Sequence, residues 1–394
     1  MADLSFKAFD ADNHYYEATD AFTRHIPDEY RKRGVQWAVI NGKQRLMVDG
    51  KLNRFIPNPT FDPVAKPGVL DAYFRGKLAA DDIRAAFGDL EPIRPEYRDR
   101  DARLKVMDEQ GLEGAFLFPT LGVGMEESLT HDPDLAHAVF ESFNRWLEDD
   151  WGYDDGRLFA APMLCLLDPA KAEHEVDRVL AHGAKVVCLR SGPVKDPVGA
   201  RTHGDPAHAG VWARLNEAGV VVAFHSGESG YGFLPEAWGR PAEFEAFRYD
   251  AFRSIITASR PIHDTIAALV CDGVFTTYSR IRIATIESGS DWVVPLAKGL
   301  HKMFKQRPGA FGGIDPIQQL KDHLWVSPYY EDNLRAVADM IGARRMLFGS
   351  DWPHAEGLAE PTSYADDLSA AGFDEAEVRA IMRDNALALV QQPD

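Results

Sequence analysis

Residues 346–351 read MLFGSD, so Asp351 directly follows a short apolar run. Residues 220–225 read VVVAFH and present His225 in the same way. Short apolar runs of this kind are typical of buried parallel strands. In a (β/α)8 barrel, side chains at the carboxyl ends of different parallel strands build the active site. The two runs therefore favour an enzyme built on such a barrel.

Strand-like runs alternate with helical patterns along most of this chain of 394 residues. Several helical patterns open with an Asp-Pro pair and close with a glycine. The alternation predicts a parallel sheet, and eight repeats predict closure into a (β/α)8 TIM barrel, a single domain over residues 1–394. The eight runs are residues 5–9, 114–118, 158–163, 185–189, 220–224, 281–286, 323–326 and 345–348.

Two long segments interrupt this rhythm. Residues 20–100 follow strand one, and we predict that they form a cap insertion over the barrel mouth. Within them, the Asn-Gly pair inside residues 37–48 predicts a β-hairpin with a tight turn. Residues 226–262 follow strand five and are rich in aromatic side chains, which favours a helical lid over a pocket. An ordinary packing helix is the alternative for this second segment.

The composition excludes several classes of partner. The chain has 43 Lys plus Arg against 61 Asp plus Glu, a formal net charge of −18. This acidity argues against a nucleic-acid partner and against an anionic membrane surface. We see no apolar window that could span a bilayer and no signal segment at the N-terminus. The 3 cysteines lie in apolar runs and suit a reducing compartment, so we expect a cytoplasmic protein.

The residues that end the strand-like runs suit a metal ion. Asp12 and His14 lie two apart on strand one, so both face the same side. A carboxylate and an imidazole so placed can coordinate Zn²⁺ or a similar divalent ion, and His225 and Asp351 add two more candidate ligands. Asp351 could also take a proton from bound water. The set favours Zn²⁺ and leaves Mn²⁺ possible.

Three pieces of sequence together resemble a known family. The Asp-x-His start, the isolated Phe-His and the ending FGSDWPH at residues 348–354 resemble the amidohydrolase superfamily. More narrowly, they are similar to the amidohydrolase-2 branch of aminocarboxymuconate-semialdehyde decarboxylase and the aromatic-acid decarboxylases. The resemblance covers strand one and roughly residues 100–390. It implies a (β/α)8 barrel with one divalent metal, often in a homodimer. The ligands it implies are Asp12, His14, His225 and Asp351.

The chain departs from that branch at strand six. Glu287 stands where relatives such as the muconate decarboxylase carry a catalytic histidine. A glutamate could bind the metal, orient water or act as a base, but it cannot act as a cationic acid. His263 could supply the missing imidazole or be an exposed residue at a helix start. His354 and Glu356 could orient the ligands.

Arg190 ends strand four, where binuclear members of the superfamily carry a carbamylated lysine, so one metal is expected. Its guanidinium suits a substrate carboxylate, and a structural salt bridge is the alternative.

Three functions remain open from the sequence. The favoured one is metal-dependent decarboxylation of a small aromatic or unsaturated organic acid, with Arg190 or His263 positioning the carboxylate and Asp351 or Glu287 handling the proton. The alternative is hydrolysis of an ester, lactone or amide by metal-activated water, with Asp351 as the general base. A catalytically inactive barrel that acts as a binding protein is the third, and the retained candidate ligands argue against it.

Overall fold

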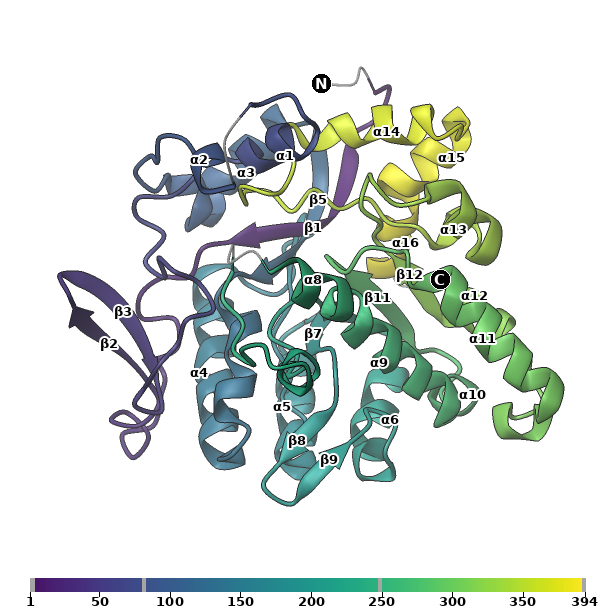
Figure 1. Cartoon of the computed structure of the whole chain (residues 1–394), viewed down its shortest axis with the longest axis horizontal. Coiled ribbons are helices and arrows are strands. Elements are labelled where there is room, and N and C mark those ends of the chain that lie inside the picture. The colour runs from purple at the N-terminus through teal and green to yellow at the C-terminus, as the bar shows by residue number, and fades with distance from the viewer. Residues whose placement is uncertain (1–3, 80–82, 247–249, 392–394) are drawn as a thin grey trace.

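The core of the molecule is a TIM barrel built from seven parallel strands and an eighth extended segment, which isolated bridges and backbone hydrogen bonds close into a ring. Figure 1 shows helices around these strands. The computed structural model describes residues 4–79, 83–246 and 250–391. β1 pairs with β5 and β5 with β6, while β7, β10, β11 and β12 are neighbours in that order. The strands are β1 (Ala8–Tyr15), β5 (Leu112–Pro119), β6 (Leu158–Ala160), β7 (Val186–Arg190), β10 (Val221–His225), β11 (Arg282–Ile286) and β12 (Leu324–Val326).

Residues 346–348 complete the ring without forming a regular strand. Leu347 N donates to Val326 O at 2.8 Å, and Ala11 N donates to Phe348 O at 2.8 Å. An isolated parallel bridge after β6 joins that strand to β7. The chain therefore forms the predicted barrel, and further backbone hydrogen bonds, Asp351 N to Asp12 O and His14 N to Trp352 O, both at 2.8 Å, extend the contact of the eighth segment with β1.

Helices cover the outside of the ring, which explains the apolar character of its strands. All five residues of β10 are buried, because a barrel strand is covered by side chains within and by helices outside. The helix before β10 ends at Gly219, whose φ of 62° is the left-handed conformation of a helix end.

The helices of the first half are α1 (Val69–Phe74), α2 (Ile83–Ala86), α3 (Arg100–Glu109), α4 (Pro133–Asp150), α5 (Pro169–Ala181) and α6 (Ala209–Ala218). Those of the second half are α7 (Phe233–Ala237), α8 (Ala251–Thr257), α9 (Arg260–Cys271), α10 (Val274–Thr277), α11 (Val293–Gln306), α12 (Pro316–His323), α13 (Leu334–Ile341), α14 (Tyr364–Ala370), α15 (Glu375–Arg379) and α16 (Asn385–Val390). Two short strands, β8 (Val194–Asp196) and β9 (Gly199–Arg201), form an antiparallel pair after β7. No helix in the described ranges is long and apolar enough to cross a membrane.

The hairpin predicted from the Asn-Gly pair is present. β2 (Val35–Ile40) pairs antiparallel with β3 (Lys43–Val48), and β4 (Lys51–Leu52) adds a short third strand. Asn41 and Gly42 have φ values of 52° and 74°, as a tight turn with two left-handed residues requires. The hairpin lies at the side of the molecule beside α4 (Figure 1).

The segment after β10 contains two short helices, α7 and α8, and residues 238–246 after α7 are irregular. This segment meets the segment that follows the hairpin. Ala246 N donates to Phe55 O at 3.0 Å, and the rings of Phe55 and Phe244 have centroids 5.5 Å apart. Two stretches separated by nearly half the chain therefore pack together next to the barrel.

Candidate active site

The ends of β1 and β10 bring two imidazoles and a carboxylate together. His14 Nε2 lies 3.2 Å from His225 Nε2. Asp12 Oδ1 lies 3.3 Å from the first of these nitrogens and 3.5 Å from the second. This oxygen is buried and makes no hydrogen bond. A buried carboxylate oxygen without a donor is costly unless a cation is bound beside it.

The two imidazoles present Nε2 to the cluster but differ in the direction of their pKa shifts. His225 Nδ1 lies 2.7 Å from the carbonyl oxygen of Ser226, which can only accept, so Nδ1 carries the proton. In the neutral ring Nε2 then presents its lone pair to the cluster. Burial lowers the pKa of His14 to about 3, so this ring is neutral. The Asp12 and Glu287 carboxylates instead raise the pKa of His225 against the effect of its burial, and a cation bound between these oxygens would compete with that proton. Neutral imidazoles are the form that coordinates a metal.

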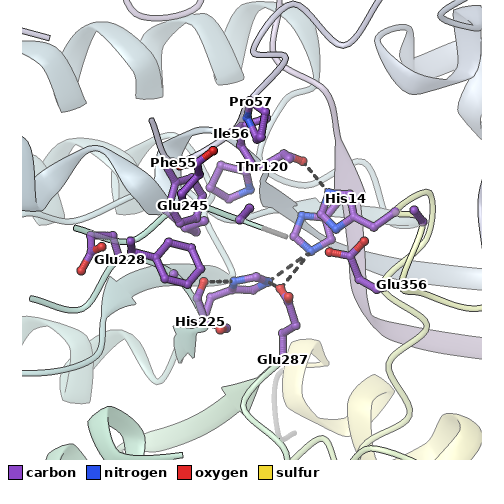
Figure 2. Close-up of a pocket in the computed structure, with 18 of the residues that line it drawn as sticks. His14, Phe55, Ile56, Pro57, Thr120, His225, Glu228, Glu245, Glu287 and Glu356 are labelled. Atoms are coloured by element: carbon purple, nitrogen blue, oxygen red, sulfur yellow. Dashed lines mark hydrogen bonds and ion pairs between the residues drawn. The ribbon is translucent and has the colours of Figure 1, made fainter. Parts of the chain in front are cut away.

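Glu287 follows β11 and Asp351 follows the eighth strand, and both complete the cluster. Figure 2 shows Glu287 beside His225. Glu287 Oε2 lies 3.3 Å from His225 Nε2 and 3.9 Å from His14 Nε2. Asp351 Oδ1 lies 3.4 Å from His14 Nε2. Both acidic residues have left-handed backbones, with φ values of 49° and 56°, a conformation that costs free energy and concentrates at functional sites.

The donor set fits a divalent cation. Burial raises the pKa of Glu287 and of Asp351, and neighbouring carboxylates raise both further. Such mutual repulsion disappears when a cation sits between the oxygens. Two imidazoles with two or three carboxylates suit Zn²⁺ or Mn²⁺. The residues that would hold the ion are Asp12, His14 and His225, with Asp351 and Glu287 beside them.

A hydrogen-bonded chain runs from Asp351 away from the cluster. Asp351 Oδ1 lies 2.6 Å from His354 Nδ1, and His354 Nε2 lies 2.9 Å from Thr120 Oγ1. The hydroxyl of Thr120 donates to the carbonyl of Tyr15 at 2.9 Å, so its oxygen must accept from His354 Nε2. One proton is therefore shared between His354 Nδ1 and Asp351, which is the arrangement of a proton relay.

A buried clamp fixes the metal-binding end of β1 to the eighth strand. The Asp10 carboxylate accepts from Ser350 N at 2.9 Å, Ser350 Oγ at 2.5 Å and Asn13 Nδ2 at 2.9 Å. The strands approach so closely that a Cβ on Gly349 would lie 2.5 Å from Asp12 Cβ. This clamp was not predicted from the sequence. Its one signal is a second acid two residues before Asp12, on the same strand.

Three members of the cluster, His14, His225 and Glu287, line a cavity of about 720 Å³. Both long segments contribute to its walls, through residues 55–65 and 87–90 of the first and residues 226–231, 244–246 and 253–262 of the second. The hairpin, residues 35–48, does not reach it. The wall is largely apolar and includes Phe55, Phe61, Val64, Leu90, Phe244 and Ile262.

Arg190 and His263 lie outside both the ligand cluster and the cavity lining. The Arg190 guanidinium donates to Glu126 Oε1 at 2.9 Å and to Glu127 Oε2 at 2.6 Å. These contacts are those of the structural salt bridge that the sequence left open. His263 is a third exposed and pairs with Asp264 at 2.8 Å. The imidazole that does face the cavity beside the ligands is His354.

Comparison with known proteins places the chain in a family. A family model described as amidohydrolase matches residues 82–391. The crystal structure of an amidohydrolase from Mycobacterium avium subsp. paratuberculosis is 45% identical, covers 99% of both chains and has a TM-score of 0.93. No curated protein sequence matches significantly.

Two decarboxylases share the fold at low identity. A dihydroxybenzoic acid decarboxylase from a Polaromonas species, crystallised with manganese and 2-nitroresorcinol, is 15% identical with a TM-score of 0.57, covering 98% of this chain and 97% of its own. A 5-carboxyvanillate decarboxylase from Sphingomonas paucimobilis is 15% identical with a TM-score of 0.58, covering 98% and 99%. These similarities concern the fold alone. The family model and the mycobacterial structure together establish that this chain belongs to the amidohydrolase family.

Proposed function

We propose that this protein is a metal-dependent carboxy-lyase that removes CO₂ from an organic acid with an aromatic or unsaturated body. One observation carries the proposal. The carboxyl group of Asp351 lies between the ligand cluster, 3.4 Å from His14 Nε2, and an imidazole that can supply a proton, 2.6 Å away on His354. A proton donor so placed next to a cation site is what loss of CO₂ requires.

The cluster residues would hold the metal, with Zn²⁺ favoured and Mn²⁺ the alternative. When bound, a divalent cation would polarise the substrate's oxygens and stabilise the charge that departing CO₂ leaves behind. The relative from Polaromonas was crystallised with manganese, which supports testing that ion first.

Asp351 would supply the proton that ends the reaction. As the bond between the substrate carbon and its carboxyl group breaks, the electron pair stays on that carbon. The proton of Asp351 then forms the new C–H bond, and CO₂ leaves uncharged. This proton is the one that Asp351 shares with His354 Nδ1, so solvent would return a proton to the pair before the next turnover. Thr120 holds the imidazole in the orientation that the sharing needs.

The two long segments would act as cap and lid. Both contribute apolar side chains to the cavity wall, and they are joined at Phe55 and Phe244. Apolar walls exclude water and favour a reaction in which a localised carboxylate charge disperses. In this role residues 55–65, 244–246 and 253–262 hold the body of the substrate while the barrel residues carry out the chemistry.

Hydrolysis of an ester, lactone or amide is the second candidate, and Glu287 favours it. Glu287 Oε2 lies 3.3 Å from His225 Nε2, so a carboxylate stands where a cationic acid would assist decarboxylation. In that reaction Asp351 would take the proton from the attacking water and return it to the leaving group. Both reactions use the same ligands, so the fold does not decide between them.

Two measurements test the proposal. The first is the metal content of the purified protein by elemental mass spectrometry, with wild type beside Asp351→Asn and His225→Ala. About one ion per chain, lost from His225→Ala, is expected for a single-metal site. The second is CO₂ release from hydroxybenzoates and muconates, set against turnover of aryl esters and lactones. Ester turnover without CO₂ release would replace decarboxylation by hydrolysis.

A further inference from the structure

We infer that Arg253 forms a carboxylate-binding subsite in the cavity wall, so that the substrate has an apolar body with an anionic group at the end remote from the ligand cluster. The inference deepens the proposed function and rests on it for the reaction at the other end of the substrate. It gives Arg253 the recognition role that the sequence had suggested for Arg190.

Arg253 is the one lysine or arginine among the described residues that line the cavity. It comes from α8, in the segment after β10. Its Nη1 donates to three backbone carbonyls, those of Pro241, Ala242 and Glu243, at 2.9 to 3.0 Å. These bonds fix the guanidinium to the wall through a single nitrogen.

The remaining edge of this guanidinium has no acceptor among the described residues. Nε is buried without a hydrogen-bond partner, and no described atom accepts from Nη2. Nε and Nη2 form the edge that binds both oxygens of a carboxylate in parallel bonds. A buried donor without an acceptor is unfavourable, and a ligand carboxylate that reached this edge would remove that cost.

Neighbouring acids leave this edge unpaired. Glu228 also lines the cavity and is close enough for Arg253 to influence its pKa, yet the two form no ion pair. Its Oε1 instead accepts from Gly230 N at 3.0 Å, within its own loop. The contrast with Arg190 is direct, because that guanidinium is neutralised by two glutamates.

The place of Arg253 in the wall defines the shape of the substrate. Its guanidinium lies 5.6 Å from the centroid of the Phe244 ring, which packs against Phe55. Figure 2 shows Phe55 on the side of the cavity away from Glu356, with His14 between the two in the view. A substrate that reaches both ends thus places its reacting carboxyl group at the cluster and a second anion at Arg253. Aromatic and aliphatic side chains surround the part between them.

Binding of matched acids to the metal-loaded protein tests the subsite without relying on turnover. Terephthalate and 4-methylbenzoate differ only in a carboxylate against a methyl group, and 4-carboxycinnamate and 4-methylcinnamate repeat the comparison with a longer body. By isothermal titration calorimetry, wild type should bind the diacid at least about tenfold more tightly in one of the two pairs. Equal or weaker binding of the diacid in both pairs would overturn the inference.

Variants assign any preference to Arg253. Arg253→Gln should abolish the diacid preference, and Arg253→Lys should keep part of it because a point charge lacks the paired geometry. The matched control is Arg260→Gln. Arg260 begins the neighbouring helix α9, is not itself a cavity-lining residue, and pairs with Asp264 at 2.8 Å. A merely structural arginine would change the melting temperature but leave the ratio of the two affinities unchanged. If Arg253→Gln does not fold, full retention of the wild-type ratio by Arg253→Lys would count against the subsite.

This binding experiment separates the inference from the proposed function. A diacid preference that depends on Arg253, in a protein that releases no CO₂ from any acid, would leave the subsite standing and reject decarboxylation. CO₂ release from monoacids and diacids at equal efficiency, with no role for Arg253 in binding, would support decarboxylation and reject the subsite.

Discussion

The two ends of the cavity are built in different ways. At the ligand cluster, short buried strands present each side chain, and backbone hydrogen bonds such as Asp351 N to Asp12 O at 2.8 Å fix their spacing. At the opposite wall, two long segments with little regular structure meet through a few contacts, among them the Phe55 and Phe244 rings. Rigid elements hold reacting groups precisely, whereas loops vary what is recognised.

The comparison predicts that substitutions at the cluster act on metal and rate, while substitutions in the wall act on affinity. Substitutions in the hairpin should affect neither metal nor affinity. The hairpin belongs to the same segment as Phe55, residues 20–100, but lies outside the cavity lining. Four substitutions, ordered from the largest expected effect to the smallest, test this division.

The largest effect is expected for His225→Ala. This change removes one of two imidazoles that lie 3.2 Å apart, and the remaining ligands should no longer retain the ion. We expect loss of the metal and of all measurable turnover together, measured by elemental mass spectrometry and by the CO₂ assay. His263→Ala, which alters a third-exposed residue outside the cavity, is the control and should change neither. A His225→Ala protein with full metal content would remove this residue from the ligand set.

Glu287→Gln should lower the turnover rate without removing most of the bound metal. Glutamine keeps a similar shape and an oxygen atom but removes the negative charge beside His225, so the other ligands should still hold most of the metal. We expect turnover to fall about 100-fold, within the range found when a residue supporting a metal or a proton transfer is changed. The measurement is kcat beside metal content for the same preparation. An unchanged kcat would show that Glu287 takes no part in the reaction.

The difference between the strand-borne cluster and the loop-built wall also explains which features could be predicted from the sequence. The ligand candidates follow short apolar runs, and strand direction alone predicts that Asp12 and His14 share a side and that His225 and Asp351 lie at the same end of the barrel. The hairpin could also be predicted, because an Asn-Gly turn is a local sequence signal. These features depend on residues within a few positions of one another.

The arginines show where that reasoning stops. Arg190 ends a barrel strand and so looked like a substrate-binding residue, but Glu126 and Glu127, more than sixty positions earlier, take up its donors. Arg253 has no strand-end signal, and its role follows only from the carbonyls of residues 241–243 around it. His354 was named from its closeness to Asp351, whereas its link to Thr120 needed the fold. Long-range contacts decide these cases.

A smaller effect is expected in the wall. Phe55→Ala removes an aromatic side chain from the cavity and its contact with the Phe244 ring, but touches no ligand. We expect KM to rise about tenfold, the scale for one lost apolar side chain in a binding site, with kcat and metal content close to wild type. Steady-state kinetics on the best substrate measures this. A fall in kcat with unchanged KM would mean that the wall acts on the chemistry, against the division drawn here.

The smallest effect is expected at the hairpin turn, where two glycines allow a matched experiment. A Cβ added to Gly42 or to Gly299 meets no atom within 4 Å, so neither Gly→Ala substitution causes a clash. Gly42 has a φ of 74°, which alanine adopts at a cost of about 1 kcal/mol, whereas Gly299 lies within α11, where alanine gains up to about 1 kcal/mol. Thermal unfolding should therefore shift in opposite directions for the two variants. Because the hairpin does not line the cavity, kcat/KM should stay at the wild-type value in both. A loss of activity in Gly42→Ala at temperatures where it is fully folded would mean that the hairpin communicates with the cavity, and the whole first insertion would then have to be treated as one functional unit.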